Sequence, residues 1–203
     1  ESCLVGSEMC IRDRLIPLEG ATTHSHGPEG EHEHTGWAFT TWLDPELAAL
    51  QAEAVAAAIS AALPEHSSDV RVRLEELHAD LKSLDDRLAA AAAVIDDEPL
   101  LFSHPVYQYL IGRYGLNGVE VHWEPDRAPD GHAWDHLEEQ MTTHAAHWML
   151  WEGEPIEDIV IGLDELGIDS LLFDPCGNSP DEGDYLTVME ANVGSLETIA
   201  ENL

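Results

Sequence analysis

The stretch PLLFSHPVYQYLIGRYGL, residues 99–116, shows the pattern that decides the fold. A short apolar run, PLLF, is followed by a turn and then by a helical stretch, VYQYLIGRYGL. Gly115 lies where the end of that helix needs a residue that tolerates a left-handed conformation. The same strand-then-helix order recurs three more times in the remaining sequence. Four such units in succession predict a parallel sheet covered by helices, so we expect an α/β fold for residues 97–203.

The other three units place candidate ligands at the ends of strands. They read VEVHW then HAWDHLEEQMTTHAA, HWMLW then IEDIVIGLDELG, and DSLLF then DYLTVMEANVGSLETIAENL. In such sheets ligands bind at the carboxyl ends of the strands. His104 comes just after PLLF, and Asp174 comes directly after SLLF. A lone histidine at a strand end is often only a hydrogen-bonded structural residue, but an imidazole and a carboxylate that converge from two strands can bind a metal ion. We therefore predict that His104 and Asp174 are metal ligands.

Two helices are predicted upstream of the sheet. Asp44 and Pro45 supply an N-cap and a first-turn proline, and good helix formers continue from there to Pro64. The second helix extends from about residue 69 to about residue 95, and its apolar residues recur at steps of three and four. These residues are Val70, Leu74, Leu77, Leu81, Leu84 and Leu88. A helix of this length spans roughly 40 Å, enough to cross a domain, although a short coiled-coil arm would carry the same stripe.

The chain is strongly acidic. Its 203 residues include 8 lysines and arginines against 41 aspartates and glutamates, a formal net charge of -33. This charge repels phosphate backbones and anionic lipid surfaces, so we expect neither a nucleic-acid partner nor binding to a membrane surface. It attracts cations, but a solvated surface accounts for most of it, and the charge alone names no ligand.

Cysteine usage excludes two kinds of scaffold. Cys3 and Cys10 lie in the first ten residues, and Cys176 stands alone. A disulfide framework or a thiolate zinc site is therefore not expected. The sequence also contains no apolar run long enough to span a bilayer and no charged-then-apolar leader.

A histidine-rich segment, GATTHSHGPEGEHEHTG, occupies residues 20–36 and lacks apolar periodicity, so we expect a mobile surface loop. It contains His24, His26, His32 and His34, interleaved with Glu29, Glu31 and Glu33. Imidazole and carboxylate are ligands that borderline divalent metals prefer, and a loop can wrap them around an ion. We favour transient metal capture by these histidines over a polar, pH-sensitive loop without an ion.

Other candidate motifs give weaker signals. His132 and His136 are four residues apart and His144 and His147 three apart, but the HExxH pattern that would add a general base is absent, so we expect surface histidines. The sequence contains no GxSxG elbow and no glycine-rich phosphate loop. We therefore expect a protein that is not an enzyme.

The first residues, ESCLVGSEMCIRDR, have no periodicity and look like translated sequencing-adapter DNA. We expect residues 1–14 to be a non-native peptide and the native chain to begin further upstream, with an export signal that this fragment lacks.

The order of these parts resembles the zinc- and manganese-binding solute-binding proteins of metal ABC importers (the ZnuA/TroA-like family), with residues 15–203 matching an N-terminally truncated member. The resemblance rests on a WLDP helix start after the histidine loop, a strand-end HxxYxYL…YGL pattern, and a late DP turn followed by a helix with Asn. The matching residues are Trp42, Leu43, Asp44, Pro45, His104, Tyr107, Tyr109, Leu110, Tyr114, Gly115, Leu116, Asp174, Pro175 and Asn192.

The resemblance implies a ligand set and shows one departure from it. It implies that His104 is the third ligand and Asp174 the fourth, while the first lies in an N-terminal lobe that this chain largely lacks. Family members usually carry a second ligand, a His two residues before the Trp of WLDP, where this chain has Thr40. Either His34 or another loop histidine substitutes for it, or the site uses fewer protein ligands.

The resemblance also implies an architecture and a role. Residues 15–67 would be the end of the N-terminal lobe, residues 68–96 the long helix connecting two lobes, and residues 97–203 the C-terminal α/β lobe. The protein would be periplasmic, or extracytoplasmic and membrane-anchored, and would deliver zinc to the membrane permease of an ABC importer as a monomer. Manganese is the alternative cargo, because a second carboxylate would favour it over zinc.

Three other functions remain open at this stage. A metal buffer or chaperone would use the histidine loop alone, and a metal-dependent hydrolase would need a general base for which the sequence offers no motif. A solute-binding protein for a siderophore or haem would share the long helix but would not need His104.

Overall fold

The computed structural model describes residues 14–17, 22–25, 31–34, 36–180 and 182–203. The chain divides into two compact units, Glu1–Asp85 and Asp86–Leu203. The boundary falls inside the helix α3, Ser67–Ile95, so this helix contributes to both.

The N-terminal unit is dominated by two helices. The helix α2, Pro45–Ala62, begins at the N-cap Asp44, whose side chain accepts hydrogen bonds from the backbone N–H groups of Glu46 and Leu47. Short 3-10 turns precede and follow it, η2 at Thr41–Leu43 and η3 at Pro64–His66. Both helices that the sequence predicts are therefore present, with the predicted cap and first-turn proline.

One prediction for this unit was wrong. The segment expected to be a loop contains two short strands, β1 at Thr22–Ser25 and β2 at Glu31–His34. They pair antiparallel, with His24 opposite His32 and Thr22 opposite His34. Two strands can pair through their backbones without an apolar face. The segment therefore lacks the alternation of apolar residues by which strands are predicted from sequence.

The C-terminal unit contains the predicted parallel sheet. Its strands are β3 (Leu100–Phe102), β4 (Gly118–Glu120), β5 (Trp148–Trp151) and β6 (Asp169–Leu172). They are ordered β4-β3-β5-β6, and all three pairings are parallel. The carboxyl ends of these strands consequently meet at one edge of the sheet.

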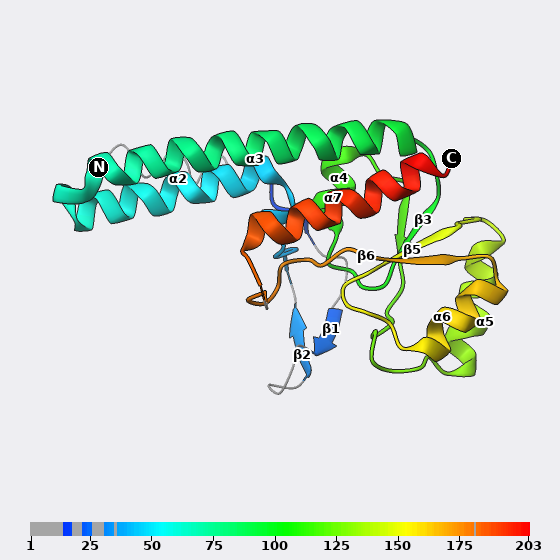
Figure 1. Ribbon diagram of the computed structural model, residues 1–203. Coiled ribbons are helices and arrows are strands. Elements are labelled where there is room, and N and C mark those ends of the chain that lie inside the picture. The colour runs from blue at the N-terminus through cyan, green and yellow to red at the C-terminus, as the bar shows by residue number, and fades with distance from the viewer. Residues whose placement is uncertain (1–13, 18–21, 26–30, 35, 181) are drawn as a thin grey trace. The chain divides into compact units, whose positions relative to one another are not determined.

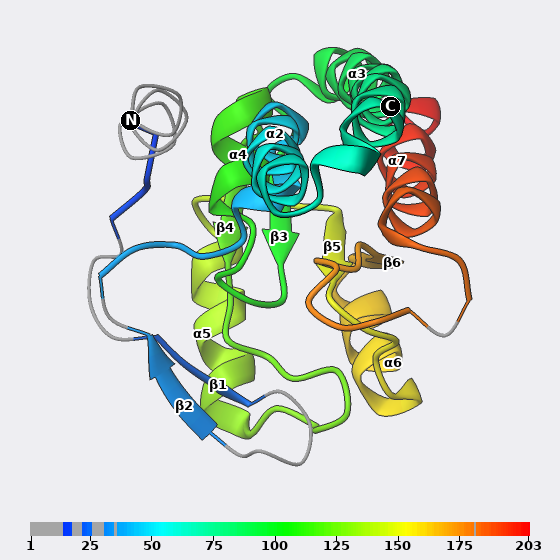
Figure 2. The same cartoon turned by 90° about the vertical axis from the view of Figure 1, so that its left-hand side faces the viewer.

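Four helices alternate with the strands: α4 (Gln108–Tyr114), α5 (Gly131–Met141), α6 (Glu157–Glu165) and α7 (Tyr185–Glu201). Gly115 ends α4 in the left-handed conformation, as predicted. Figures 1 and 2 show α5 and α6 on one side of the sheet and α4 and α7 on the other. The α/β fold expected for this part of the chain is confirmed.

The core of this unit lies where the sheet meets α5 and α6. It contains Leu101, Met149 and Trp151 from the strands, with Leu137 from α5 and Ile159 and Leu163 from α6. All six side chains are fully buried. This packing fixes the strands, and with them the residues that follow at their carboxyl ends. Among the described residues, no helix has both the length and the apolar character needed to cross a membrane.

Candidate metal centre

His104 lies just beyond the carboxyl end of β3 and is buried, with 3% of its surface exposed. Its Nδ1 is 3.1 Å from the backbone carbonyl oxygen of Trp123. A carbonyl oxygen can only accept a hydrogen bond, so Nδ1 carries the proton and donates it. In the neutral ring this leaves a lone pair on Nε2, the form of histidine that binds metal ions.

Two carboxylates lie close to this ring. The Oε1 atom of Glu152 is 3.5 Å from Nδ1, and the Oε1 atom of Glu124 is 3.5 Å from Nε2. One ligand atom from each of His104, Glu124 and Glu152 lies within 4.8 Å of the other two. Nitrogen and carboxylate oxygen together form a donor set suited to zinc or manganese.

The surroundings of the two carboxylates differ. Glu152 directly follows β5, its side chain is only 11% exposed, and its backbone N–H donates to the hydroxyl of the buried Ser103. The Glu124 side chain is 33% exposed and, with His122 and Arg127, lines a cavity of about 240 Å³. Glu124 therefore adjoins a cavity, whereas Glu152 is largely enclosed.

The local environment favours the neutral form of two imidazoles. Burial lowers the pKa of His104, and this effect outweighs the neighbouring Glu124 carboxylate and the Trp123 carbonyl, which favour the charged ring. Burial and the nearby His104 ring, whose centroid is 6.3 Å away, lower the pKa of His122. A neutral imidazole is the form that binds a metal ion, so the centre is suited to bind one near neutral pH.

Asp174 follows β6 and Phe173 and is held firmly by its neighbours. Its backbone N–H donates to Asn192 Oδ1 at 2.9 Å, and Asn192 Nδ2 donates to its carbonyl at 2.7 Å. The hydroxyl of the buried Tyr107 donates to the Phe173 carbonyl at 2.7 Å. Asp174 is not a member of the three-residue group around His104; one of its carboxylate oxygens accepts from the backbone N–H of Cys176.

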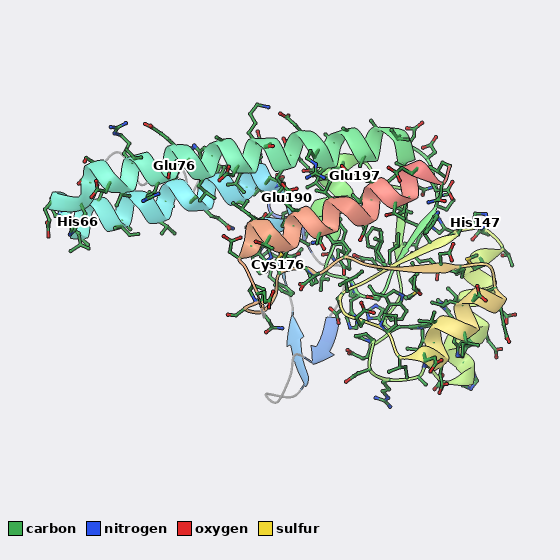
Figure 3. All side chains as sticks on the ribbon, viewed as in Figure 1. His66, Glu76, His147, Cys176, Glu190 and Glu197 are labelled. Atoms are coloured by element: carbon green, nitrogen blue, oxygen red, sulfur yellow. The ribbon has the colours of Figure 1, made fainter. Side chains whose placement is uncertain are left out.

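The surroundings of Cys176 disfavour its thiolate form. Burial raises the pKa of its thiol to about 12, and the nearby Asp174 carboxylate adds to this effect. It lies in the segment between β6 and α7 (Figure 3).

The other predicted ligands are the four histidines of the histidine-rich segment. His26 lies outside the described residues, and for His24, His32 and His34 only the backbone is described. Thr40, at the position where the resemblance implies a histidine, is buried.

The four helix-associated histidines were predicted to be surface residues. His132 and His136 are exposed on α5, as predicted. His147 is exposed too, and its Nδ1 lies 3.4 Å from the carbonyl of Gly167. His144 is only partly exposed, because its Nε2 lies 3.0 Å from the carbonyl of Leu100.

Sequence reasoning missed Glu124 and Glu152. Glu152 could have been found, because it directly follows the apolar run HWMLW and so obeys the same strand-end rule as Asp174. Glu124 lies four residues beyond the end of β4, in a segment with no periodicity, and nothing distinguishes it from the other acidic residues of the chain.

A parallel α/β unit that gathers an imidazole and carboxylates at the carboxyl edge of its sheet is the kind of lobe that binds a metal ion. The family model described as "ZnuA: Zinc-uptake complex component A periplasmic" matches residues 9–199. The chain belongs to this family, and the resemblance inferred from its motifs is confirmed.

Curated relatives agree with this assignment. The chain is 24% identical over 181 residues to the zinc-binding lipoprotein AdcA of Streptococcus pneumoniae, a match that covers 86% of this chain and 36% of the relative. It is 27% identical over 89 residues to the high-affinity zinc uptake system protein ZnuA of Brucella abortus, which covers 43% of this chain and 27% of the relative. The chain thus spans about a third or less of the length of these relatives.

Solved structures share the fold. The metal-dependent lipoprotein YcdH of Bacillus subtilis superposes with a TM-score of 0.72 at 20% identity, covering 81% of this chain and 64% of the other. The Zn(II)-bound AdcA of Streptococcus pneumoniae gives a TM-score of 0.73 at 21% identity, covering 83% of this chain and 37% of the other.

Proposed function

We propose that this chain is part of an extracytoplasmic receptor that binds zinc and delivers it to the permease of an ABC importer. The observation that carries the proposal is His104, a buried imidazole whose Nδ1 is hydrogen-bonded to a carbonyl and whose ring lies beside the carboxylates of Glu124 and Glu152. Its position at the edge of the sheet is the position of the ligand histidine in the family motif. The zinc-uptake family model and the zinc-related names of the relatives support zinc rather than manganese as the cargo.

In this proposal His104 and Asp174 are metal ligands supplied by the C-terminal unit. The reciprocal hydrogen bonds between Asp174 and Asn192 fix the backbone from which the carboxylate extends, which lowers the entropic cost of ordering a ligand. Glu152 holds the His104 ring by adding a negative charge beside its Nδ1–H, the arrangement that orients many metal-binding histidines.

The histidine segment would have a separate role. His24, His26, His32 and His34 are proposed to collect ions and raise their local concentration, without forming the tight site. The receptor would act as a monomer outside the cytoplasm, with domains divided as the resemblance implies.

Two alternatives have less support. A metal buffer that used the histidine segment alone would not need the buried group around His104. A hydrolase would require a general base positioned beside a metal-activated water, for which the sequence offers no motif, and the family is one of zinc uptake. A receptor for zinc is the function that accounts for both the family and the buried imidazole.

The test is isothermal titration of zinc into the full chain and its variants. We expect one tight site that His104→Ala weakens by at least 100-fold and that Asp174→Ala weakens by at least 10-fold, while His132→Ala, on the exposed face of α5, leaves it unchanged. Deletion of residues 22–34 should remove only weak binding. Tight binding that survives His104→Ala, or that disappears with the deletion alone, would overturn the proposal. Circular dichroism of each variant separates loss of binding from loss of fold.

A further inference from the structure

We infer that His132 and His136 form a second metal site on the exposed face of α5, separate from the candidate centre at His104. The site would take a borderline divalent cation such as Zn²⁺ or Ni²⁺, with two imidazoles as protein ligands and water completing the coordination sphere. Neither histidine belongs to the group around His104 or lines the cavity beside Glu124. The inference therefore goes beyond the proposed function and does not depend on it.

The spacing of the two histidines suits a single ion. Residues four apart in an α-helix lie on the same face, one turn from each other, with their Cβ atoms about 6 Å apart. The helix α5 is continuous from Gly131 to Met141, so both positions obey this geometry. Zinc binds imidazole nitrogen at about 2.0–2.1 Å. Two imidazoles at this spacing on one helix can therefore reach the same ion.

The rest of the C-terminal unit holds α5 in place and leaves this face open. The N-cap Asp130 accepts a hydrogen bond from the Ala133 N–H at 2.9 Å, and Leu137 is fully buried in the core. His132 and His136 are both exposed. The packed helix thus fixes the spacing of two ligands before an ion arrives, which lowers the entropic cost of binding.

The two imidazoles are not engaged elsewhere. Within the part of the chain that the structure describes, no hydrogen bond, ion pair or ring contact involves His132 or His136. The other close pair, His144 and His147, follows α5 rather than lying on a helix, and each of its rings faces a backbone carbonyl. Of the two pairs, the one on α5 combines helical spacing with rings that are free to turn toward an ion.

The charge of α5 favours a cation. The helix contains three exposed acids, Asp135, Glu138 and Glu139, and no lysine or arginine. Asp135 is three residues after His132, and Glu139 is three residues after His136, so these two carboxylates neighbour the pair on the helix surface. Their negative charge raises the local concentration of divalent cations beside the imidazoles.

The experiment is a zinc titration of the full chain with the loop histidines replaced by serine (His24→Ser, His26→Ser, His32→Ser and His34→Ser). Calorimetry separates the tight phase expected from the candidate centre from a weaker second phase. His132→Ala, His136→Ala and the double variant are compared in this background. The imidazole signals are also followed by NMR during addition of substoichiometric Ni²⁺, because this paramagnetic ion broadens the rings that bind it.

We expect His132→Ala and His136→Ala each to raise the Kd of the weak phase at least about 10-fold, because a single imidazole no longer chelates the ion. The double variant should bind little more weakly than either single variant, since the two residues share one ion. Ni²⁺ should broaden both rings together.

Two controls test the spacing. His147→Ala should leave the weak phase unchanged. His136→Ala combined with Glu138→His keeps the number of histidines on α5 but moves the second one to a different face, so it should not restore the weak phase.

The inference is wrong if the weak phase is missing from the parent chain, if both single variants keep its Kd within threefold, or if the spacing control restores it. Loss of the tight phase with the weak phase intact would instead contradict the proposed function and leave the inference standing. Circular dichroism of each variant confirms that the helices remain folded.

Discussion

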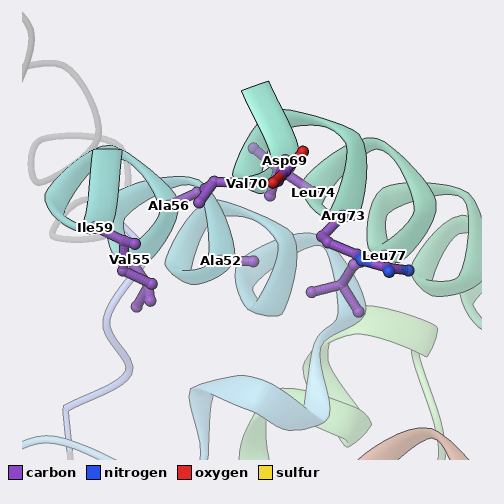
Figure 4. A pocket seen from close by; sticks show the side chains of 9 residues that line it. All are labelled: Ala52, Val55, Ala56, Ile59, Asp69, Val70, Arg73, Leu74 and Leu77. Atoms are coloured by element: carbon purple, nitrogen blue, oxygen red, sulfur yellow. The ribbon is translucent and has the colours of Figure 1, made fainter. Parts of the chain in front are cut away.

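The two units of the chain place apolar side chains of their helices in different surroundings. In the C-terminal unit the strands and helices enclose a core that includes fully buried Leu101 and Trp151. In the N-terminal unit the helices α2 and α3 line an apolar groove of about 340 Å³, shown in Figure 4, and Val55 and Ile59 on its rim are 58% and 41% exposed. Apolar spacing therefore predicts that a helix forms, but not how completely its stripe is covered.

This difference matters for the metal centre because a ligand is only as well positioned as the element that carries it. His104 and Glu152 lie just beyond the ends of strands of the enclosed sheet, and Asp174 is fixed by hydrogen bonds to α7. We expect the site-bearing unit to be the more sensitive of the two to changes in packing, and four measurements test this expectation.

The largest effect should come from removing a core side chain. Leu101→Ala truncates a fully buried residue of β3 and should lower the free energy of unfolding by about 2–5 kcal/mol, because the sheet cannot collapse onto the cavity. Val55→Ala on the exposed groove should change it by no more than about 0.5 kcal/mol. Urea denaturation followed by circular dichroism measures both, and equal losses would remove the contrast between the units.

Most of the fold could be predicted from the sequence for a local reason. The strand runs are short and apolar, the helices between them have stops such as Gly115, and a run of such units leaves little choice but a parallel sheet; upstream, Asp44 caps α2. The paired strands at residues 22–25 and 31–34 were missed because their pairing leaves no apolar signature.

The site could be predicted only in part. His104 and Asp174 stand out because they follow strand runs and belong to a recognisable motif. Glu124 does not, because its place beside His104 depends on the path of the segment after β4, and this path is set by tertiary hydrogen bonds such as that from the Trp123 N–H to the Ser103 carbonyl. Local periodicity contains no information about such a path.

A second measurement concerns a buried acid near the edge of the sheet. Glu120 ends β4, one of its carboxylate oxygens is buried without a hydrogen-bond partner among the described residues, and burial raises its pKa to about 7. A carboxyl group whose folded-state pKa is raised binds its proton more tightly when folded. The stabilising contribution of protonated Glu120 to the folded protein is therefore fully present below about pH 4.5 and is lost as the pH rises through 7.

Glu120→Gln should accordingly remove this pH dependence. The free energy of unfolding of the variant should equal that of the wild type near pH 4.5 and exceed it by about 1–2 kcal/mol at pH 8. This value is discounted for the partial exposure of the Glu120 side chain. Urea denaturation at both pH values, in the presence of a chelator, checks this. A variant that gains nothing at pH 8 would show that Glu120 is solvated in the folded protein.

A third measurement compares two glycines within helices of the C-terminal unit. An added Cβ at Gly162 in α6 would lie 2.6 Å from the indole of Trp134, whereas one at Gly194 in α7 would meet no atom within 4 Å. Gly194→Ala should stabilise the protein by about 0.5–1 kcal/mol through helix propensity. Gly162→Ala should lower the free energy of unfolding by about 1 kcal/mol net, because Trp134 must move from its contact with Trp123.

Thermal unfolding of the two alanine variants checks the sign of each change, and tryptophan fluorescence should shift only for Gly162→Ala. Stabilisation of equal size at both positions would mean that the indole of Trp134 yields easily, and that packing beside α6 is looser than the buried core suggests.

The smallest effect should come from the surface ion pairs. In the C-terminal unit Arg87 on α3 pairs with Glu197 at 3.0 Å and with Glu190, two residues of α7 labelled in Figure 3. The hydrogen bond to Glu197 is the main reason that the pKa of Arg87 is raised. Arg87 is 41% exposed, so Arg87→Gln should lower the free energy of unfolding by at most about 1 kcal/mol, and by less at high salt.

Arg73→Gln, which breaks an exposed pair with Glu76 inside the α3 part of the N-terminal unit, should lower it by about 0.3 kcal/mol or less. Urea titrations at low and high salt measure both losses. Arg87 joins two helices of the site-bearing unit, whereas Arg73 joins only two turns of one helix. We therefore expect contacts between elements to stabilise the protein more than charge pairs within one helix. Equal losses for Arg73→Gln and Arg87→Gln would contradict this expectation.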